Sequence, residues 1–252
     1  MPIQRSKGIL LRRQALRETS FILSFYTRDF GKIKGVVKGA RGSRAIGHGG
    51  GAYEIFALDD IVFYERKARE IYTISQCDLA EYFMPVRRSL EKVSYAMYLA
   101  ELLDSVSGMS DPHPDVFDLT LGCLGMISDG AYPRGVARLF EIKLLSCLGI
   151  MPTLGMCAQC ESGVDTGSRF SLRHGGLLCK NCTGKDINAY PILRGTARFI
   201  EHVQGLPIDK AIRIKVAEEV ARELETILRR FLDYHIERRL NTLKFLKLAE
   251  MA

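Results

Sequence analysis

Hydrophobic and polar residues alternate along the first third of the chain, in short runs separated by turn residues. Alternation with a period of two is typical of β-strands, and five closely spaced runs indicate a small all-β domain. Asp29 and Gly31 mark a hairpin turn between the second and third runs. The predicted strands are residues 8–13, 20–28, 32–38, 53–64 and 70–77.

Beyond residue 82 the period changes, because apolar residues recur every three or four positions. This spacing predicts amphipathic helices. Proline is favoured in the first turn of a helix, and it opens three of these patterns, at Pro85, Pro114 and Pro133. Gly149 ends the third pattern. Two further helical patterns follow, a short one at residues 194–203 and a long or broken one at residues 210–248.

These patterns predict an α+β protein with several domains, and 252 residues of which 47% are hydrophobic can bury a sizeable core. A β-barrel is expected over residues 1–80, and an all-helical domain over residues 81–150 and 188–252. A cysteine-rich insertion occupies residues 151–187. The five strands fit an oligonucleotide-binding (OB) fold, which is a five-stranded Greek-key barrel. An SH3-like barrel fits the strand count almost as well.

Aromatic and basic residues interleave in the second and third predicted strands, and this pattern favours the OB fold, where aromatic rings stack on bases beside cations that pair with phosphates. Alternation places Phe21 and Phe25 on the inward face of the barrel. Tyr26 and Phe30 are therefore the better stacking candidates. The candidate phosphate contacts are Lys32, Lys34, Lys38, Arg41 and Arg44.

The positive charge of the chain is concentrated in the same region. Residues 1–50 contain eleven lysines or arginines against Glu18 and Asp29, whereas the remainder has 25 basic residues against 27 acidic ones. This distribution is typical of a nucleic-acid surface at one end of the chain, although a solvated basic surface without a partner also fits it. A second patch for DNA or a protein partner, or else a solvated helix face, is formed by Arg229, Arg230, Arg238 and Arg239.

Four of the seven cysteines fall within 26 residues, as two C-x2-C pairs with eighteen residues between them. Pairs separated by about 15 to 20 residues present four thiolates to a tetrahedral Zn²⁺ ion. Four protein ligands close the coordination sphere, so one structural zinc per chain is expected, in a ribbon or knuckle. The alternatives are two disulfides, or a site where His174 replaces one thiolate. The predicted ligands are Cys157, Cys160, Cys179 and Cys182.

Other reactive chemistry is sparse. The five histidines form no metal or triad pattern, and the adjacent Asp59 and Asp60 point to opposite faces of a strand. We therefore expect no catalytic residues and no enzyme activity. Cys77, Cys123 and Cys147 have apolar neighbours and are expected in the core. No apolar signal segment precedes the first strand and no run approaches the roughly 18 apolar residues of a membrane span, so a cytoplasmic protein without membrane contact is expected.

Several strings together resemble the bacterial RecO family of recombination-mediator proteins, over essentially the full length. Residues 31–41 (GKIKGVVKGAR) are similar to the family's glycine and lysine-glycine-alanine-arginine signature on the third barrel strand. Residues 148–154 (LGIMPTL), followed by the first cysteine pair, resemble the family's exit from a helix into the knuckle. Tyr234-His235, Arg238-Arg239 and residues 243–246 (LKFL) resemble its C-terminal helix. The glycine-rich residues 47–51 depart from the family pattern.

The resemblance implies a nucleoid-associated DNA repair factor that binds single-stranded and double-stranded DNA and anneals complementary strands. It further implies action with RecR on DNA covered by single-strand-binding protein (SSB), with contact to the SSB C-terminal tail, so that RecA can load. The residues alone predict a basic, aromatic-bearing barrel without a catalytic constellation, and the two readings agree. The alternative is a zinc-ribbon adaptor that binds another protein and has no catalytic activity.

Overall fold

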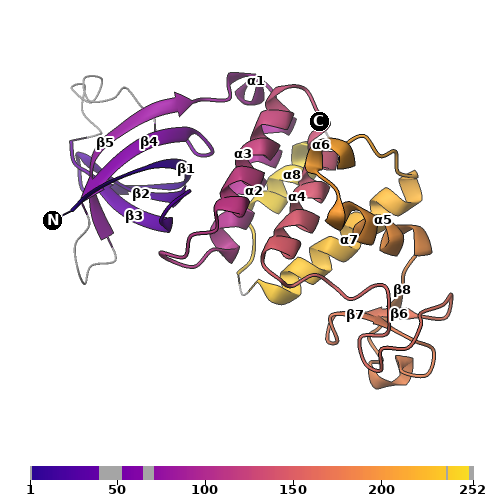
Figure 1. Cartoon of the computed structure of the whole chain (residues 1–252). Helices are drawn as coiled ribbons and strands as arrows, with labels where there is room; N and C mark the ends of the chain where they lie inside the picture. The colour runs from indigo at the N-terminus through magenta and orange to yellow at the C-terminus, as the bar shows by residue number, and fades with distance from the viewer. Residues whose placement is uncertain (1, 40–52, 65–70, 237, 250–252) are drawn as a thin grey trace. The chain divides into compact units, whose positions relative to one another are not determined.

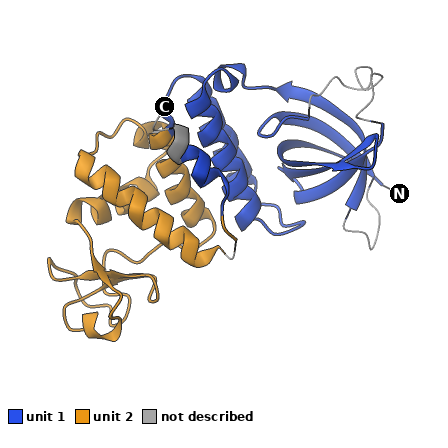
Figure 2. Ribbon diagram, turned by 180° about the vertical axis from the view of Figure 1, so that it is seen from behind, with its two compact units in different colours: residues 1–133, 240–252 blue, residues 134–239 orange. Residues whose placement is uncertain are grey.

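The computed structural model describes residues 2–39, 53–64, 71–236 and 238–249. The chain forms two compact units, one of residues 1–133 with 240–252 and one of residues 134–239 (Figure 2). The first unit contains a barrel with helices, and the second contains helices and the cysteine-rich segment. The domain boundaries expected near residues 80, 150 and 187 follow changes in the sequence pattern, whereas the two units are defined by compactness. The expected boundaries therefore stay a prediction.

The barrel closes in the strand order β1-β2-β3-β5-β4 (Figure 1). β3 and β5 pair in parallel, while the other neighbours are antiparallel, and β1 is long enough to pair with both β2 and β4. A closed five-stranded barrel of this connectivity is the predicted OB fold, which sets the SH3-like alternative aside. The strands are β1 Ile3–Leu16, β2 Ser20–Thr27, β3 Gly31–Val37, β4 Leu58–Tyr64 and β5 Ile71–Glu81.

Two strand boundaries differ from the expectation for local reasons. β4 begins at Leu58 and not at residue 53, because Tyr53 and Phe56 have φ angles of 44° and 59°, which interrupt an extended strand. β1 extends beyond residues 8–13 at both ends, since ladder hydrogen bonds continue along polar stretches that carry no hydrophobic alternation.

The barrel core is formed by inward side chains of all five strands, among them Leu10, Phe25, Ile33 and Ile74. The placement of Phe21 and Phe25 toward this core is confirmed. Gly35 of β3 belongs to the core wall, because a Cβ atom there would lie 2.5 Å from the side chain of Ile74. The glycine therefore permits the close parallel pairing of β3 with β5.

Helices α1 Met84–Arg87, α2 Leu90–Val106, α3 Pro114–Ser128 and α8 Thr242–Ala249 complete the first unit. The single helix expected from Pro85 is two helices, because the Ser89 side chain caps α2 by accepting a hydrogen bond from the Lys92 backbone at 3.4 Å. α8 packs on α2. The Glu101 carboxylate of α2 accepts hydrogen bonds from the backbone of Asn241 (3.0 Å) and of Thr242 (2.8 Å), so it caps a helix distant in sequence.

The second unit contains α4 Pro133–Cys147, α5 Arg194–Gly205, α6 Ile208–Ala211 and α7 Glu218–His235. Its small sheet has the order β7-β6-β8, with β6 Arg169–Ser171, β7 Gly176–Leu178 and β8 Tyr190–Pro191. The pattern over residues 210–248 is thus several helices, because Ile236 after α7 has extended backbone angles. Cys77 and Cys123 are buried as expected, whereas Cys147 is exposed, since it lies in the last turn of α4.

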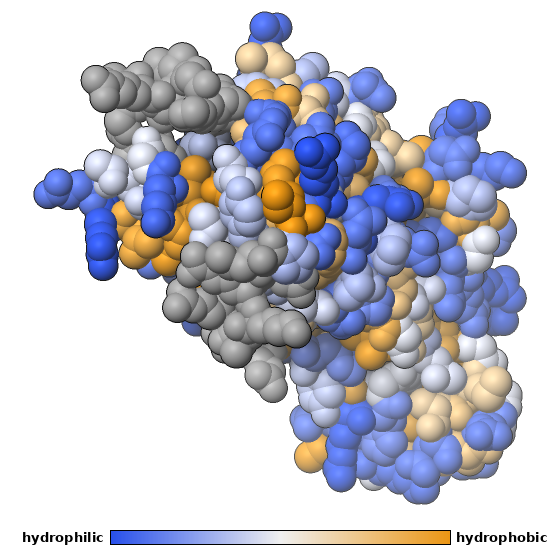
Figure 3. Space-filling model, turned by 60° about the vertical axis from the view of Figure 1, so that its left-hand side comes forward, coloured by the Kyte–Doolittle hydropathy of each residue, from blue (hydrophilic) through white to orange (hydrophobic). Residues whose placement is uncertain are grey.

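Among the described residues, no helix is long and apolar enough to cross a membrane. On the face shown in Figure 3, hydrophilic residues predominate and hydrophobic residues gather in separate small patches. Small patches of exposed apolar residues are common on folded proteins, because polar groups are too few to cover the whole surface.

Candidate metal centre and nucleic-acid surface

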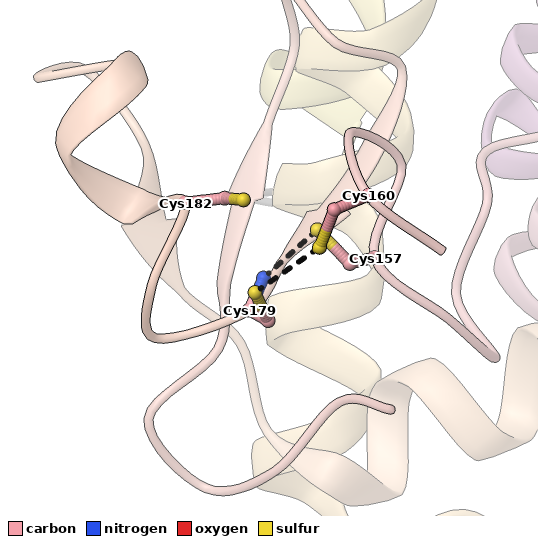
Figure 4. Close-up of side chains that lie close together, drawn as sticks. All are labelled: Cys157, Cys160, Cys179 and Cys182. Carbon is pink, nitrogen blue, oxygen red and sulfur yellow. Dashed lines mark hydrogen bonds between the residues drawn. The ribbon is translucent and has the colours of Figure 1, made fainter. Parts of the chain in front are cut away.

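The four cysteines of the two C-x2-C pairs converge at one point of the second unit. Their Sγ atoms all lie within 4.8 Å of one another, and the Sγ atoms of Cys160 and Cys179 are 3.7 Å apart. Figure 4 shows the side chains of Cys157 and Cys160 together at the right, Cys179 below them and Cys182 at the left, with their sulfur atoms directed toward a common centre. All seven cysteines are free thiols, so the disulfide alternative is not supported.

Two similar tight turns present these sulfurs. In the first, the backbone N–H of Glu161 donates to the carbonyl of Cys157 at 2.9 Å, and in the second the N–H of Cys182 donates to the carbonyl of Cys179 at 2.8 Å. β7 ends at Leu178, so Cys179 begins the second turn directly after the small sheet. Each turn therefore fixes one pair of sulfurs, and the β6–β7 hairpin sets the spacing between the pairs.

The backbone also favours negative charge on this cluster. The N–H of Cys179 donates to Sγ of Cys157 at 3.3 Å. Burial raises the pKa of the Cys157 thiol, but N–H groups of Cys179, Gln159 and Cys160 outweigh that effect and lower its pKa to about 6. The sulfur of Cys160, followed by burial and the other cluster sulfurs, raises the pKa of Cys182 to about 12. Four thiolates are thus unfavourable together unless a cation joins them.

The sulfur spacing fits a tetrahedral metal ion. Four ligands about 2.3 Å from a Zn²⁺ ion lie about 3.8 Å from one another, close to the 3.7 Å between Cys160 and Cys179. His174 does not belong to the cluster, since its Nδ1 is 3.0 Å from Oγ of Ser171 in the β6–β7 turn. This places His174 as the turn residue and leaves the four sulfurs as the set that could hold a metal ion among the described residues.

On the barrel, Lys32 is a structural residue and not a surface cation. Its Nζ donates to the backbone carbonyl of Asp104 at 2.6 Å and lies 3.3 Å from Oδ1 of the same residue. Arg12 contacts the other oxygen of Asp104 at 2.5 Å. The Lys32 side chain is only 13% exposed, so we remove Lys32 from the set of phosphate contacts. The sequence signal for this pairing is Asp104 itself, a carboxylate among the apolar residues of α2 that needs a cationic partner.

Tyr26 is a second correction. It is 1% exposed, and its hydroxyl donates to the carbonyl of His113 at 3.4 Å. A ring without exposed surface cannot stack on a base, so Tyr26 is also removed from the DNA-contacting set. Phe30 is half-buried, with its ring 5.3 Å from that of Phe63 in an edge contact, and its stacking role stays a prediction.

Lys34 and Lys38 are the predicted phosphate contacts that the structure leaves exposed. Lys34 lies on the outer face of β3, and Lys38 follows the end of that strand. Neither has an ion-pair partner within the described residues. Arg41 and Arg44 lie outside the part of the chain that the structure describes, and their role stays a prediction.

Acidic residues from later in the chain neutralise much of the basic excess of residues 1–50. This pairing reduces the number of candidate phosphate contacts, because a cation whose charge is neutralised by a carboxylate attracts a phosphate less strongly. The pairs are Lys7–Asp60, Arg12–Asp104, Arg13–Glu54, Arg28–Asp118 and Lys32–Asp104.

The predicted C-terminal patch is likewise partly engaged. The guanidinium of Arg229 pairs with the Asp233 carboxylate, and its Nε is 3.0 Å from Oδ2. Arg230 lies over the ring of Tyr190 at 5.0 Å from the centroid. Arg238 and Arg239 are exposed beyond the end of α7. The four arginines therefore do not form one uniform basic face, and their role in binding stays a prediction.

We expect Lys32→Met to lower the free energy of unfolding by about 1–3 kcal/mol, because the Asp104 carbonyl and carboxylate lose a buried charged donor while Arg12 still pairs with the carboxylate. Urea unfolding followed by circular dichroism measures this. Lys34→Met is the control, since the exposed Lys34 should change stability by less than about 0.5 kcal/mol. Equal effects of the two variants would contradict the structural role of Lys32.

The sequence and its relatives agree with this architecture. The "Recombination protein O N terminal" family matches residues 1–83, and the "Recombination protein O C terminal" family matches residues 87–244. The chain is 31% identical to the DNA repair protein RecO of Pelotomaculum thermopropionicum, over 98% of this chain and 94% of the relative. It is 30% identical to RecO of Desulforamulus reducens over the same shares, and 32% identical to RecO of Anaeromyxobacter dehalogenans over 95% and 94%. An OB barrel followed by helices and a four-cysteine knuckle, matched over nearly its whole length by these relatives, places the chain in the RecO family of DNA repair proteins.

Proposed function

We propose that this protein is a recombination mediator that binds single-stranded and double-stranded DNA and anneals complementary strands. In this role it acts with RecR on DNA covered by SSB, contacts the SSB C-terminal tail, and helps RecA to load, in the cytoplasm at the nucleoid. The observation that carries the proposal is the exposure of Lys34 and Lys38, which form no ion pair with any described residue, on an OB barrel in a chain of the RecO family.

Annealing requires that two polyanions approach each other, which happens only if protein cations replace their counterions. Lys34 and Lys38 supply such cations at the outer face and the end of β3, with Arg41 and Arg44 following in sequence. Lys34 lies on a strand and Lys38 directly follows it, so neither lies on a recognition helix that would enter a groove. The contacts are therefore to phosphates, and DNA of every sequence is bound alike.

The four clustered cysteines hold one structural Zn²⁺ ion. A four-sulfur set leaves no open position for water or substrate, so the metal stabilises the fold of the knuckle and takes no part in a reaction. Asp59 is buried and the adjacent Asp60 is exposed, so these two carboxylates do not face one substrate as an acid-base pair would. The protein thus acts by binding and not as an enzyme.

The double variant Lys34→Ala/Lys38→Ala tests the barrel surface. Each phosphate contact contributes a slope of about −0.7 in log affinity against log salt on single strands, so the slope should flatten by about 1.4. Annealing of complementary oligonucleotides should slow in parallel. Fluorescence anisotropy with labelled oligonucleotides of several sequences, at a series of salt concentrations, measures the slope.

Arg88→Ala/Lys92→Ala is the matched control, because it removes the same charge from the helical part of the same unit. A folded Lys34/Lys38 variant with the original slope and annealing rate would move the DNA surface elsewhere. Wild-type protein with neither measurable DNA affinity nor a salt slope would favour the protein adaptor instead.

A further inference from the structure

The second unit contains a groove of about 490 Å³ at the edge of the cysteine knuckle. The segment after the β6 strand forms one side, with Leu172 and Arg173. The segment after the second cysteine pair contributes residues 185–188, and Tyr234 comes from the last turn of α7. The groove thus combines a basic, an aromatic and an apolar element in one place.

Arg173 and Lys185 supply the charge. Both are exposed, and neither forms an ion pair within the described residues. The groove also contains the carboxylate of Asp186, which accepts hydrogen bonds from Oγ of Ser171 (2.6 Å) and from the backbone of Asn188 (2.9 Å). Asp186 therefore holds the loop in place, and two cations remain against one hydrogen-bonded carboxylate.

Two large side chains are unusually exposed in the same groove. Tyr234 is 56% exposed and Ile187 is 93% exposed. The ring of Tyr234 lies 5.5 Å from that of His235 in an edge contact, which restrains the exposed ring beside the groove. An aromatic side chain held at the surface next to cations is the arrangement that binds unstacked bases.

We propose that this groove is a second contact site for single-stranded nucleic acid, separate from the barrel surface. Arg173 and Lys185 pair with successive phosphates while a base stacks on Tyr234 and packs against Ile187. This inference rests on the proposed DNA-binding function and adds a site in the other unit of the chain. Duplex DNA does not fit the site equally, because its bases are stacked on one another and present no free face.

Charge complementarity favours a polyanion over a neutral partner, and the exposed ring favours a nucleic acid over an acidic peptide. An acidic peptide with apolar residues would use the cations and Ile187 but has no planar group for Tyr234. A second site in one molecule also gives annealing a physical basis, since two strands can be held by the same protein.

The test uses the full-length protein with bound zinc and a labelled oligothymidylate. Arg173→Ala/Lys185→Ala should flatten the salt slope by about 1.4, as expected for two lost phosphate contacts. Tyr234→Ala should weaken binding at least about fivefold, while Tyr234→Phe keeps the ring and should bind as wild type does. Duplex binding should change less than single-strand binding in each variant.

Lys210→Ala/Arg213→Ala is the matched control, because it removes two exposed charges from the same unit, in α6 and just after it, away from the knuckle (Figure 1). Unchanged zinc content and circular dichroism verify that each variant is folded. Groove variants that bind oligothymidylate as wild type does, while wild type itself binds DNA, would overturn this site and leave the proposed function standing. Variants that lose only the binding of an acidic, apolar-ended peptide would likewise overturn it, in favour of a peptide site.

Discussion

Cys157→Ser should abolish stoichiometric zinc binding and loosen the knuckle, while the barrel stays folded. Structural zinc contributes about 10–16 kcal/mol in peptides that fold around it, and this free energy is part of the folding free energy. The knuckle has little else to hold it, because the buried cluster around the cysteines adds only Leu178 and Ala189, with Val164 partly buried against it. Loss of one thiolate therefore removes most of what orders these turns.

Elemental analysis of the purified protein measures the zinc, and amide hydrogen exchange locates the loosening. Faster exchange is expected around the two cysteine turns, whereas β6 should be affected less because Phe170 packs against the rings of Tyr190 and Phe231. Cys147→Ser is the matched control, since Cys147 is exposed and outside the cluster. Wild-type protein that contains no zinc, or that keeps its exchange pattern under a chelator, would contradict the assignment.

The sequence was sufficient to predict those parts of the fold that depend on residues close together in the chain. The strands of the barrel follow alternation, the cysteine turns follow their spacing, and Gly149 ends α4 with a φ of 69°, which glycine adopts without strain. Asp59 and Asp60 lie on opposite faces as the strand period requires, one buried and the other exposed. Each of these features depends on residues close together in the chain.

The corrections concern contacts between distant segments. Alternation places Lys32 and Tyr26 on the outer face of the barrel, but it does not show that residues near Asp104 and His113 cover that face. The same limit applies to charge, because the acidic partners of the basic strands come from residues 54–118. A candidate DNA surface read from composition alone was therefore larger than the one that the structure leaves exposed.

Helix boundaries show the same dependence on distant partners. α8 begins where the Glu101 carboxylate caps it, and Glu101 is about 140 positions away in the sequence. The apolar period over residues 210–248 gives no sign of this cap, so the pattern predicted a long or broken helix without locating the breaks between α6, α7 and α8. Ser89, in contrast, is a local cap that the sequence displays directly before α2.

Asp59 should make the first unit less stable as the pH rises from about 4 to about 7. The residue is 1% exposed on β4, and its Oδ2 atom has no hydrogen-bond partner among the residues that the structure describes. Burial raises the pKa of Asp59 to about 7, since a hydrogen bond with Cys77 and the charge of Arg87 only partly offset the loss of hydration. The folded chain thus keeps a proton that the unfolded chain releases near pH 4.

The sign follows from this difference in pKa. Below about pH 4 both states are protonated, so the carboxyl group adds no pH dependence to stability. Between pH 4 and 7 only the unfolded state ionises, which lowers the free energy of unfolding by up to about 4 kcal/mol, at 1.36 kcal/mol per pKa unit. Above pH 7 both states are ionised, and the effect becomes constant.

Asp59→Asn removes the ionisation while keeping the shape of the neutral acid. Its advantage over wild type in urea unfolding should therefore be small at pH 4, grow to about 4 kcal/mol at pH 7, and stay level above that. Glu18→Gln is the control, because Glu18 is exposed in the same unit and is not one of the charges that act on Asp59, so this variant should keep the pH dependence that Asp59 confers. Parallel stability curves for wild type and Asp59→Asn across this range would show that the buried carboxyl group is not protonated in the folded barrel.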